Sequence, residues 1–210
     1  MIKAVGFDLD KTLYVPFPGI DEKIQEYASL RTSIFLGLDY ETTKARFGEV
    51  YNQLKSGRRT LIELGLDNNQ SENLMQDALE NADIVPLLKK DERLNQMLSR
   101  ISDKYKTFLI TGSREPIAQR KLEALGLSSV PFNSRLYAGS EYQRDTGEAF
   151  NYVASVLGVT YEEMMFVGDR ENVDIIPAKN LGMKTAIVNT QSKEATYQLK
   201  TIYDLESILL

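Results

Sequence analysis

Two stretches of the sequence place carboxylates at the end of an apolar run. Asp8 and Asp10 follow the run 2–7, and Asp169 follows a second apolar run far downstream. Asp174 lies five positions beyond Asp169. Continuous apolar runs are typical of strands in parallel sheets, which gather their chemistry at the carboxyl ends of the strands. We therefore expect the four acids to meet at one edge of a sheet.

Carboxylates brought this close repel one another unless protons or a cation neutralise them. A set of hard oxygen ligands suits Mg2+, so the sequence predicts a magnesium site. If Asp8 and Asp10 point the same way, one can attack a substrate while the other handles protons. A polar exit from a strand explains Asp8-Leu9-Asp10 alone equally well, but it does not explain the downstream Gly168-Asp169 pair.

A second feature suits phosphate. Thr111 ends the apolar run 107–110, and Gly112 allows backbone to approach a ligand closely. The Thr111 hydroxyl, nearby N–H groups and the start of the following helix can then donate to phosphate oxygens. Ser113 is a weaker candidate, because a strand-to-helix turn with Ser113 as the helix cap explains the same residues.

The composition excludes several kinds of chemistry. The 210 residues include no cysteine and no histidine, which rules out thiolate nucleophiles, disulfides and imidazole catalysis. Hydrophobic residues make up 42% and charged residues 26%, as in a globular protein with one full core and a small accessory domain. The net charge of -5 argues against nucleic-acid polymers and acidic membranes as partners. With no membrane helix or leader evident, we expect a cytoplasmic protein.

Two patterns divide the chain. After a break at Pro16-Phe17-Pro18-Gly19, apolar residues from Asp21 to about position 82 recur at helical spacing, which predicts an all-helical insertion. The remainder alternates strands and helices, which predicts a doubly wound, Rossmann-like α/β core with a parallel sheet. We assign 1–15 and 84–210 to this core and 16–83 to a helical cap.

Within the core, the expected later strands are 107–110, 130–132, 136–138, 164–167 and 184–188, and the expected helices are 91–101, 115–125, 146–157 and 173–181. A capping box at Thr160 and Glu163 predicts a helical turn before the 164–167 strand.

Three motifs together resemble the signature of a known enzyme family. These motifs are Phe7-Asp8-Leu9-Asp10-Lys11-Thr12-Leu13, the strand-ending Thr111, and Val167-Gly168-Asp169 with Asp174. They are similar to those of the haloacid dehalogenase (HAD) superfamily of aspartyl-phosphate hydrolases, in the subclass whose helical cap lies between the first two motifs. The stretches 119–127 and 178–183 also resemble its connecting helices. The resemblance implies a Mg2+-dependent phosphatase of small phosphorylated metabolites, with a cap that closes over the site.

The resemblance also implies a role for each acid. Asp8 would be the nucleophile that forms an aspartyl-phosphate, and Asp10 would protonate the leaving alkoxide and later deprotonate water. A pKa of Asp10 raised by the neighbouring acids would suit both steps. Magnesium would be held by the side chains of Asp8 and Asp169 and the carbonyl of Asp10. Thr12 would hold Asp10 in place, and Asp174 would lie at the edge of the metal site, although such a residue alone is more typical of a helix N-cap.

The cation of the site departs from the family pattern. HAD enzymes usually place a lysine, commonly followed by proline, shortly before the helix that precedes the Gly-Asp strand. Counting back from Phe150, this position is Arg144, which carries the charge on a planar fork that binds phosphate bidentately. A solvated loop arginine is the alternative. Lys121 could substitute, but its place in Arg120-Lys121-Leu122 favours the surface.

Other functions stay open. A dehalogenase also uses an aspartate nucleophile, but it needs no acid at Asp10 because halide leaves unprotonated. A receiver domain would carry its phosphoacceptor on a middle strand and would lack the helical insertion. A phosphate-metabolite sensor that kept the site but lost turnover is compatible with Arg144.

Short matches extend the resemblance to one branch of the superfamily. The segments 12–14, 19–21 and 57–65 are similar to the pyrimidine 5′-nucleotidase-like branch. In such an enzyme a base or sugar would meet side chains of the cap region, and the candidates are Tyr14, Tyr51, Arg58 and Arg59. Core packing for the tyrosines and solvation for the arginines are the alternatives.

Overall fold

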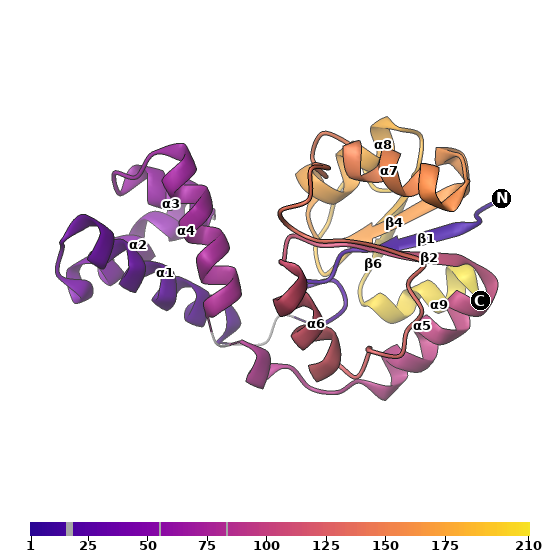
Figure 1. Cartoon of the computed structure of the whole chain (residues 1–210), viewed down its shortest axis with the longest axis horizontal. Coiled ribbons are helices and arrows are strands. Elements are labelled where there is room, and N and C mark those ends of the chain that lie inside the picture. The colour runs from indigo at the N-terminus through magenta and orange to yellow at the C-terminus, as the bar shows by residue number, and fades with distance from the viewer. Residues whose placement is uncertain (16–18, 55, 83) are drawn as a thin grey trace. The chain divides into compact units, whose positions relative to one another are not determined.

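The computed structural model describes residues 1–15, 19–54, 56–82 and 84–210. The chain forms two compact units, one made of Met1–Val15 with Leu88–Leu210 and the other of Pro16–Leu87 (Figure 1). Of the break expected at 16–19, residues 16–18 lie outside the described residues, and Gly19 directly precedes the first helix of the second unit. The helical unit extends to Leu87 because the turn Val85–Leu87 groups with it. Its role as a cap stays a prediction.

The first unit is built on a six-stranded parallel sheet of order β3-β2-β1-β4-β5-β6. The strands are β1 (Ala4–Phe7), β2 (Lys106–Ile110), β3 (Ser134–Leu136), β4 (Met164–Gly168), β5 (Lys184–Val188) and β6 (Tyr197–Leu199). The central strand β1 pairs on both sides, with Phe7 opposite Leu109 and Val167. In this register the residues after β1, β2 and β4 leave the sheet at the same edge, so the chemistry-bearing motifs converge as parallel strands require.

Helices cover both faces of the sheet, which confirms the predicted doubly wound α/β class. They are α5 (Glu92–Lys104), α6 (Glu115–Ala124), α7 (Glu148–Leu157), α8 (Ile176–Asn180) and α9 (Glu206–Leu209). Helices α7 and α8 lie on one face, and α5, α6 and α9 lie on the other (Figure 1). The capping box at Thr160 and Glu163 starts the short turn Tyr161–Glu163, which leads into β4 as expected.

Three expected elements differ from the structure. Residues 130–132 form no strand, and the strand expected over 136–138 is instead β3, which runs from Ser134 to Leu136. Pro131 has no N–H for a ladder, and its carbonyl accepts the Thr107 hydroxyl (2.7 Å). The helix expected over 173–181 starts as the π-helical turn Glu171–Ile175 and continues as α8, where Pro177 cannot supply the N–H of a regular ladder.

An aromatic core between the sheet and α7 fixes the central strands. The ring of Phe166 on β4 lies 6.0 Å from Phe108 on β2 and 4.9 Å from Phe150 on α7. A Cβ on Gly6 would overlap the Phe108 ring, so only glycine at this point of β1 lets that ring lie across the strand. The packing holds β1 and β4 in place, and both strands end at the acidic motifs.

The second unit contains α1 (Ile20–Leu36), α2 (Tyr40–Leu54), α3 (Gly57–Glu63) and α4 (Asn68–Asn81), as the helical spacing predicts. Gly37 ends α1 in the left-handed conformation (φ 65°), and Asp67 caps α4 in a box with Gln70. Among the described residues, no helix has the length and apolarity needed to cross a membrane.

Candidate active site

Asp8 occupies the centre of the candidate site, directly after β1. Its amide still donates to the Val167 carbonyl of β4 (2.9 Å), and its side chain is buried. The chain then turns sharply: the Leu13 amide donates to the Leu9 carbonyl (3.0 Å), and Lys11 adopts a φ of 61°. The turn ends the extended run, so the carboxylates of the Asp8-Leu9-Asp10 motif meet different partners.

Three carboxylates gather at this point. Asp8, Asp169 and Asp174 each offer an oxygen, and these atoms lie within 4.8 Å of one another. Asp174 is fully buried on the π-helical turn, where its Oδ2 accepts the Arg170 amide (2.9 Å). A Cβ on Gly168 would overlap the Asp174 side chain, so the glycine at the end of β4 makes room for this acid. Asp174 is therefore part of the acidic cluster and is not a helix N-cap.

The acidic cluster has the properties of a divalent-metal site. All its donors are carboxylate oxygens, and among the described residues the buried Oδ1 atoms of Asp169 and Asp174 accept no hydrogen bond. Burial raises the pKa of Asp8 to about 6, with Arg144 opposing the shift and Asp174 adding to it. Burial, Asp8 and Asp174 raise the pKa of Asp169 to about 7. A cation held by these oxygens would remove their mutual repulsion, so the residues fit Mg2+.

Arg144 supplies a buried positive charge beside the nucleophile candidate. Its side chain is 8% exposed, and its Nη1 donates to Asp8 Oδ1 (2.6 Å) and to the Ile110 carbonyl (3.1 Å). The same nitrogen lies 2.9 Å from Asp174 Oδ1, an ion pair without hydrogen-bond geometry. Burial disfavours the charge, but Asp8 and Asp174 outweigh it and raise the pKa of Arg144. A solvated loop arginine is thus the wrong alternative.

Asp10 lies in a separate network of donors. Its Oδ1 accepts from Lys121 Nζ (2.6 Å) and from the Tyr14 hydroxyl (2.8 Å), and its Oδ2 accepts from the Ser113 hydroxyl (2.7 Å). Burial opposes ionisation, but Lys121, Ser113 and Tyr14 outweigh burial and lower the pKa of Asp10. The expectation of a raised pKa is wrong, because the nearest charge is the Lys121 ammonium and not another acid.

The structure also corrects three smaller expectations. Lys121 is not a surface residue but is fully buried on α6. Ser113 is not the cap of α6, since the N-cap position is Arg114, and it binds Asp10 instead. Thr12 does not hold Asp10, because its hydroxyl lies 3.3 Å from Asp8 Oδ2, to which it donates.

Thr111, Gly112 and Arg170 border the same space. Thr111 is buried, accepts the Ser113 amide (3.1 Å) and has its hydroxyl 3.5 Å from Asp10 Oδ2. One guanidinium nitrogen each of Arg144 and Arg170 lies 4.0 Å from where a Cβ on Gly112 would be. The sequence motifs do not predict Arg170 at the site, although its place beside Asp169 is a signal that could indicate it.

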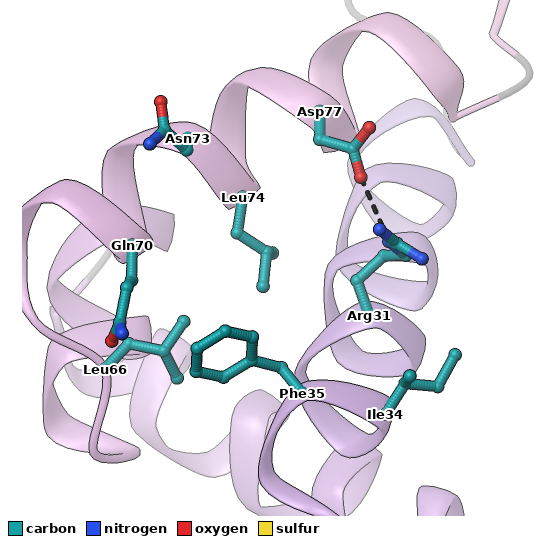
Figure 2. A pocket seen from close by; sticks show the side chains of 8 residues that line it. All are labelled: Arg31, Ile34, Phe35, Leu66, Gln70, Asn73, Leu74 and Asp77. Atoms are coloured by element: carbon teal, nitrogen blue, oxygen red, sulfur yellow. Dashed lines mark hydrogen bonds and ion pairs between the residues drawn. The ribbon is translucent and has the colours of Figure 1, made fainter.

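The helical unit has a cavity of its own, of about 380 Å³, between α1 and α4 (Figure 2). Its lining is Arg31, Ile34, Phe35, Leu66, Gln70, Asn73, Leu74 and Asp77, and Arg31 and Asp77 form an ion pair (3.1 Å). The candidates for contact with a base or sugar lie elsewhere: Tyr51 stacks on Phe47, Arg58 donates to Asn68, and Tyr14 binds Asp10.

The comparisons with known proteins agree with this fold. A model of the haloacid dehalogenase-like hydrolases matches residues 2–182. A HAD phosphatase from Thermococcus onnurineus is 23% identical, with a TM-score of 0.68 over 99% of this chain and 98% of that chain. YfnB, a HAD-hydrolase from Bacillus subtilis solved with magnesium, is 19% identical, with a TM-score of 0.63 over 99% and 98%. A 2-haloacid dehalogenase from Pseudomonas syringae is 19% identical, with a TM-score of 0.61 over 100% and 98%. No curated protein matches the sequence.

The parallel sheet with an acidic cluster at its carboxyl edge places the protein among the Rossmann-like α/β enzymes. Because the family model spans most of the chain, the protein belongs to the haloacid dehalogenase-like hydrolases. At these identities the solved structures support the fold alone.

Proposed function

We propose that the protein is a Mg2+-dependent phosphatase of small phosphomonoesters that works through phospho-Asp8. The observation that carries this proposal is the buried Asp8 carboxylate, which belongs to a carboxylate cluster suited to a metal and also accepts a hydrogen bond from the guanidinium of Arg144. A phosphoryl group that binds at Asp8 can have the negative charge of its oxygens neutralised by both a metal ion and the guanidinium.

The reaction has two halves. In the first, an Asp8 oxygen forms a bond to phosphorus, the ester P–O bond breaks, and the leaving alkoxide takes a proton from Asp10. In the second, water attacks phosphorus and gives a proton to the Asp10 carboxylate, while the bond from Asp8 to phosphorus breaks and releases phosphate. The ionised Asp10 of this structure suits the second half. Negative charge on a bound phosphoryl group raises the pKa of a nearby carboxyl, which supports protonation for the first half.

The remaining residues bind and orient the substrate. Asp8, Asp169, the carbonyl of Asp10 and the adjacent Asp174 would hold Mg2+. When bound, the metal supplies charge neutralisation for the phosphoryl oxygens. Arg144 is protonated and offsets the repulsion between Asp8 and Asp174, and one of its donors can turn to phosphate. We also propose that Arg170, Thr111 and the Gly112 backbone donate to the phosphoryl oxygens.

A direct assay tests the proposal. Release of p-nitrophenol from p-nitrophenyl phosphate is expected with Mg2+ and is expected to stop with excess EDTA. A sensor that has lost turnover would bind phosphate or vanadate without releasing product, and this outcome would overturn the proposal. A panel of phosphorylated metabolites, nucleoside monophosphates included, then ranks the substrates.

Arg144 variants test the cation. We expect Arg144→Ala to lower kcat/KM by about 10²-fold or more, since a buried donor to the charged centre is lost. It should also weaken inhibition by inorganic phosphate. Arg144→Lys keeps the charge and is expected to recover part of the loss. Exposed Asp145→Asn, next in the chain, is the matched control and should change neither constant. Unchanged kinetics in Arg144→Ala would assign the cation to another residue.

Dehalogenation is the second candidate, because a 2-haloacid dehalogenase shares the fold. The donors around Asp10 argue against it: a residue held by Lys121, Tyr14 and Ser113 has no task when the leaving group is a halide. Release of chloride from 2-chloropropionate, with no turnover of phosphate esters, would reverse this preference.

A further inference from the structure

We propose that Lys121 is a positioning residue that holds Asp10 for proton transfer to the leaving group. This inference rests on the proposed function. Lys121 lies on α6 with none of its side chain exposed, and its Nζ donates to Asp10 Oδ1 (2.6 Å) and to Ser113 Oγ (2.8 Å). The ammonium therefore contacts directly the carboxylate that the proposed reaction uses twice.

The donors that fix Asp10 come from three separate segments. Tyr14 lies in the loop after β1, Ser113 lies in the loop after β2, and Lys121 lies on α6. Lys121 also donates to Ser113, so the hydroxyl and the ammonium form one network around the carboxylate. Asp10 itself has a side chain that is 29% exposed, and without these donors its carboxylate would turn toward water. The network thus selects one orientation of a side chain that the backbone alone leaves free.

The fold alone gives no reason for a charge at position 121. The buried neighbours of Lys121 on α6 are Ile117, Ala118 and Leu122, so the position belongs to the apolar face of the helix. Burying an ammonium is costly, and an apolar residue of similar size is often as stable or more stable in place of a buried ion pair. A lysine that is aimed from this face at a reacting carboxylate fits a role in the reaction better than one in folding.

A positioning role predicts a specific kinetic pattern. An alkyl alkoxide is a poor leaving group and needs a proton from Asp10 as the ester bond breaks, whereas 2,4-dinitrophenolate leaves without one. Loss of Lys121 should therefore slow the transfer from alkyl esters far more than the transfer from activated aryl esters. A lysine that only stabilises the fold would change both rates by the same factor.

The experiment measures the first half-reaction alone. Lys121→Met is compared with the wild type in quenched single turnovers with excess enzyme and Mg2+, using propyl phosphate and 2,4-dinitrophenyl phosphate. We expect release of propanol to slow by about 10²-fold, and release of dinitrophenol to slow by less than about threefold. Asp10→Asn should give the same order of losses, because both variants act on one proton transfer. Arg120→Met, at the exposed neighbouring position on α6, is the matched control and should leave both rates unchanged.

The outcomes separate the inference from the proposed function. If the wild type releases neither alcohol, the proposed function fails and this inference fails with it. If the wild type is active and Lys121→Met loses equal factors on both esters, or loses nothing, only the positioning role is overturned. Should Lys121→Met fail to fold by circular dichroism, Ser113→Ala takes its place. That variant relaxes the same network, and it should show a smaller loss that is still confined to the alkyl ester.

Discussion

Replacing Asp8 by asparagine is expected to lower kcat by at least about 10⁴-fold, because the amide cannot form the phosphoenzyme. Asp8 directly follows the central strand β1, and its Oδ1 accepts from Arg144 Nη1 (2.6 Å). The loss should appear with every ester, good leaving groups included. Turnover of p-nitrophenyl phosphate measures it.

The fold should survive this change. Asparagine has nearly the shape of aspartate, and it removes a buried carboxyl whose pKa is raised to about 6. We therefore expect unchanged circular dichroism and a Tm for the metal-free variant no lower than that of the wild type. A second check is covalent: rapid quenching of the wild type with substrate should leave one phosphoryl group on the peptide that contains Asp8. Modest activity in Asp8→Asn, or a phosphopeptide elsewhere, would remove Asp8 from the nucleophile role.

Much of the acidic site can be predicted from the sequence, because its residues lie at the ends of parallel strands. Apolar runs predict buried strands, and the ends of β1 and β4 must share one edge if these strands pair in parallel. The positions of Asp8, Asp169 and Thr111 at strand ends depend on nothing more. The tertiary partners of Asp174 do not follow in this way, because they depend on a π-helical turn before Pro177 that periodicity does not reveal.

The burial of Lys121 is predictable from the whole of helix α6 but not from the residues beside it. The triplet Arg120-Lys121-Leu122 looks like a helix surface. Over the whole helix, the buried positions 117, 118, 121 and 122 recur at a spacing of three and four, which marks one face of α6. A lysine on an apolar face needs a buried partner, and the sequence alone does not say that the partner is Asp10.

Contacts between residues that long loops bring together cannot be predicted from the sequence alone. Arg144 could be assigned by its distance from α7, but its contact with the Ile110 carbonyl depends on how the loop from β3 to α7 folds back. The short strand β6 was missed since its three residues carry no clear alternation. Such features depend on tertiary packing, which outweighs local propensity.

Asp169→Asn is expected to make the metal-free protein more stable at pH 7.5 and to abolish its response to Mg2+. In the folded wild type, burial, Asp8 and Asp174 raise the pKa of Asp169 from 3.8 to about 7. Between these values the folded state holds a proton that the unfolded state has released. This group therefore makes the metal-free protein lose stability as the pH rises from about 4 to about 7.

This effect can be tested by measuring the Tm at several pH values, with and without Mg2+. At pH 7.5 without metal, we expect a Tm for Asp169→Asn at least about 3 °C above that of the wild type. The gap should shrink steadily as the pH falls and approach zero toward about pH 4, where the unfolded state also takes up the proton. Saturating Mg2+ should raise the Tm of the wild type at pH 7.5, since the ion binds only the folded state, and should leave the variant unchanged. Exposed Asp103→Asn on α5 is the control and should follow the wild type throughout. A wild-type Tm that ignores Mg2+ at pH 7.5 would contradict a metal site among these carboxylates, whereas a Mg2+ response that survives in Asp169→Asn would place the ion elsewhere.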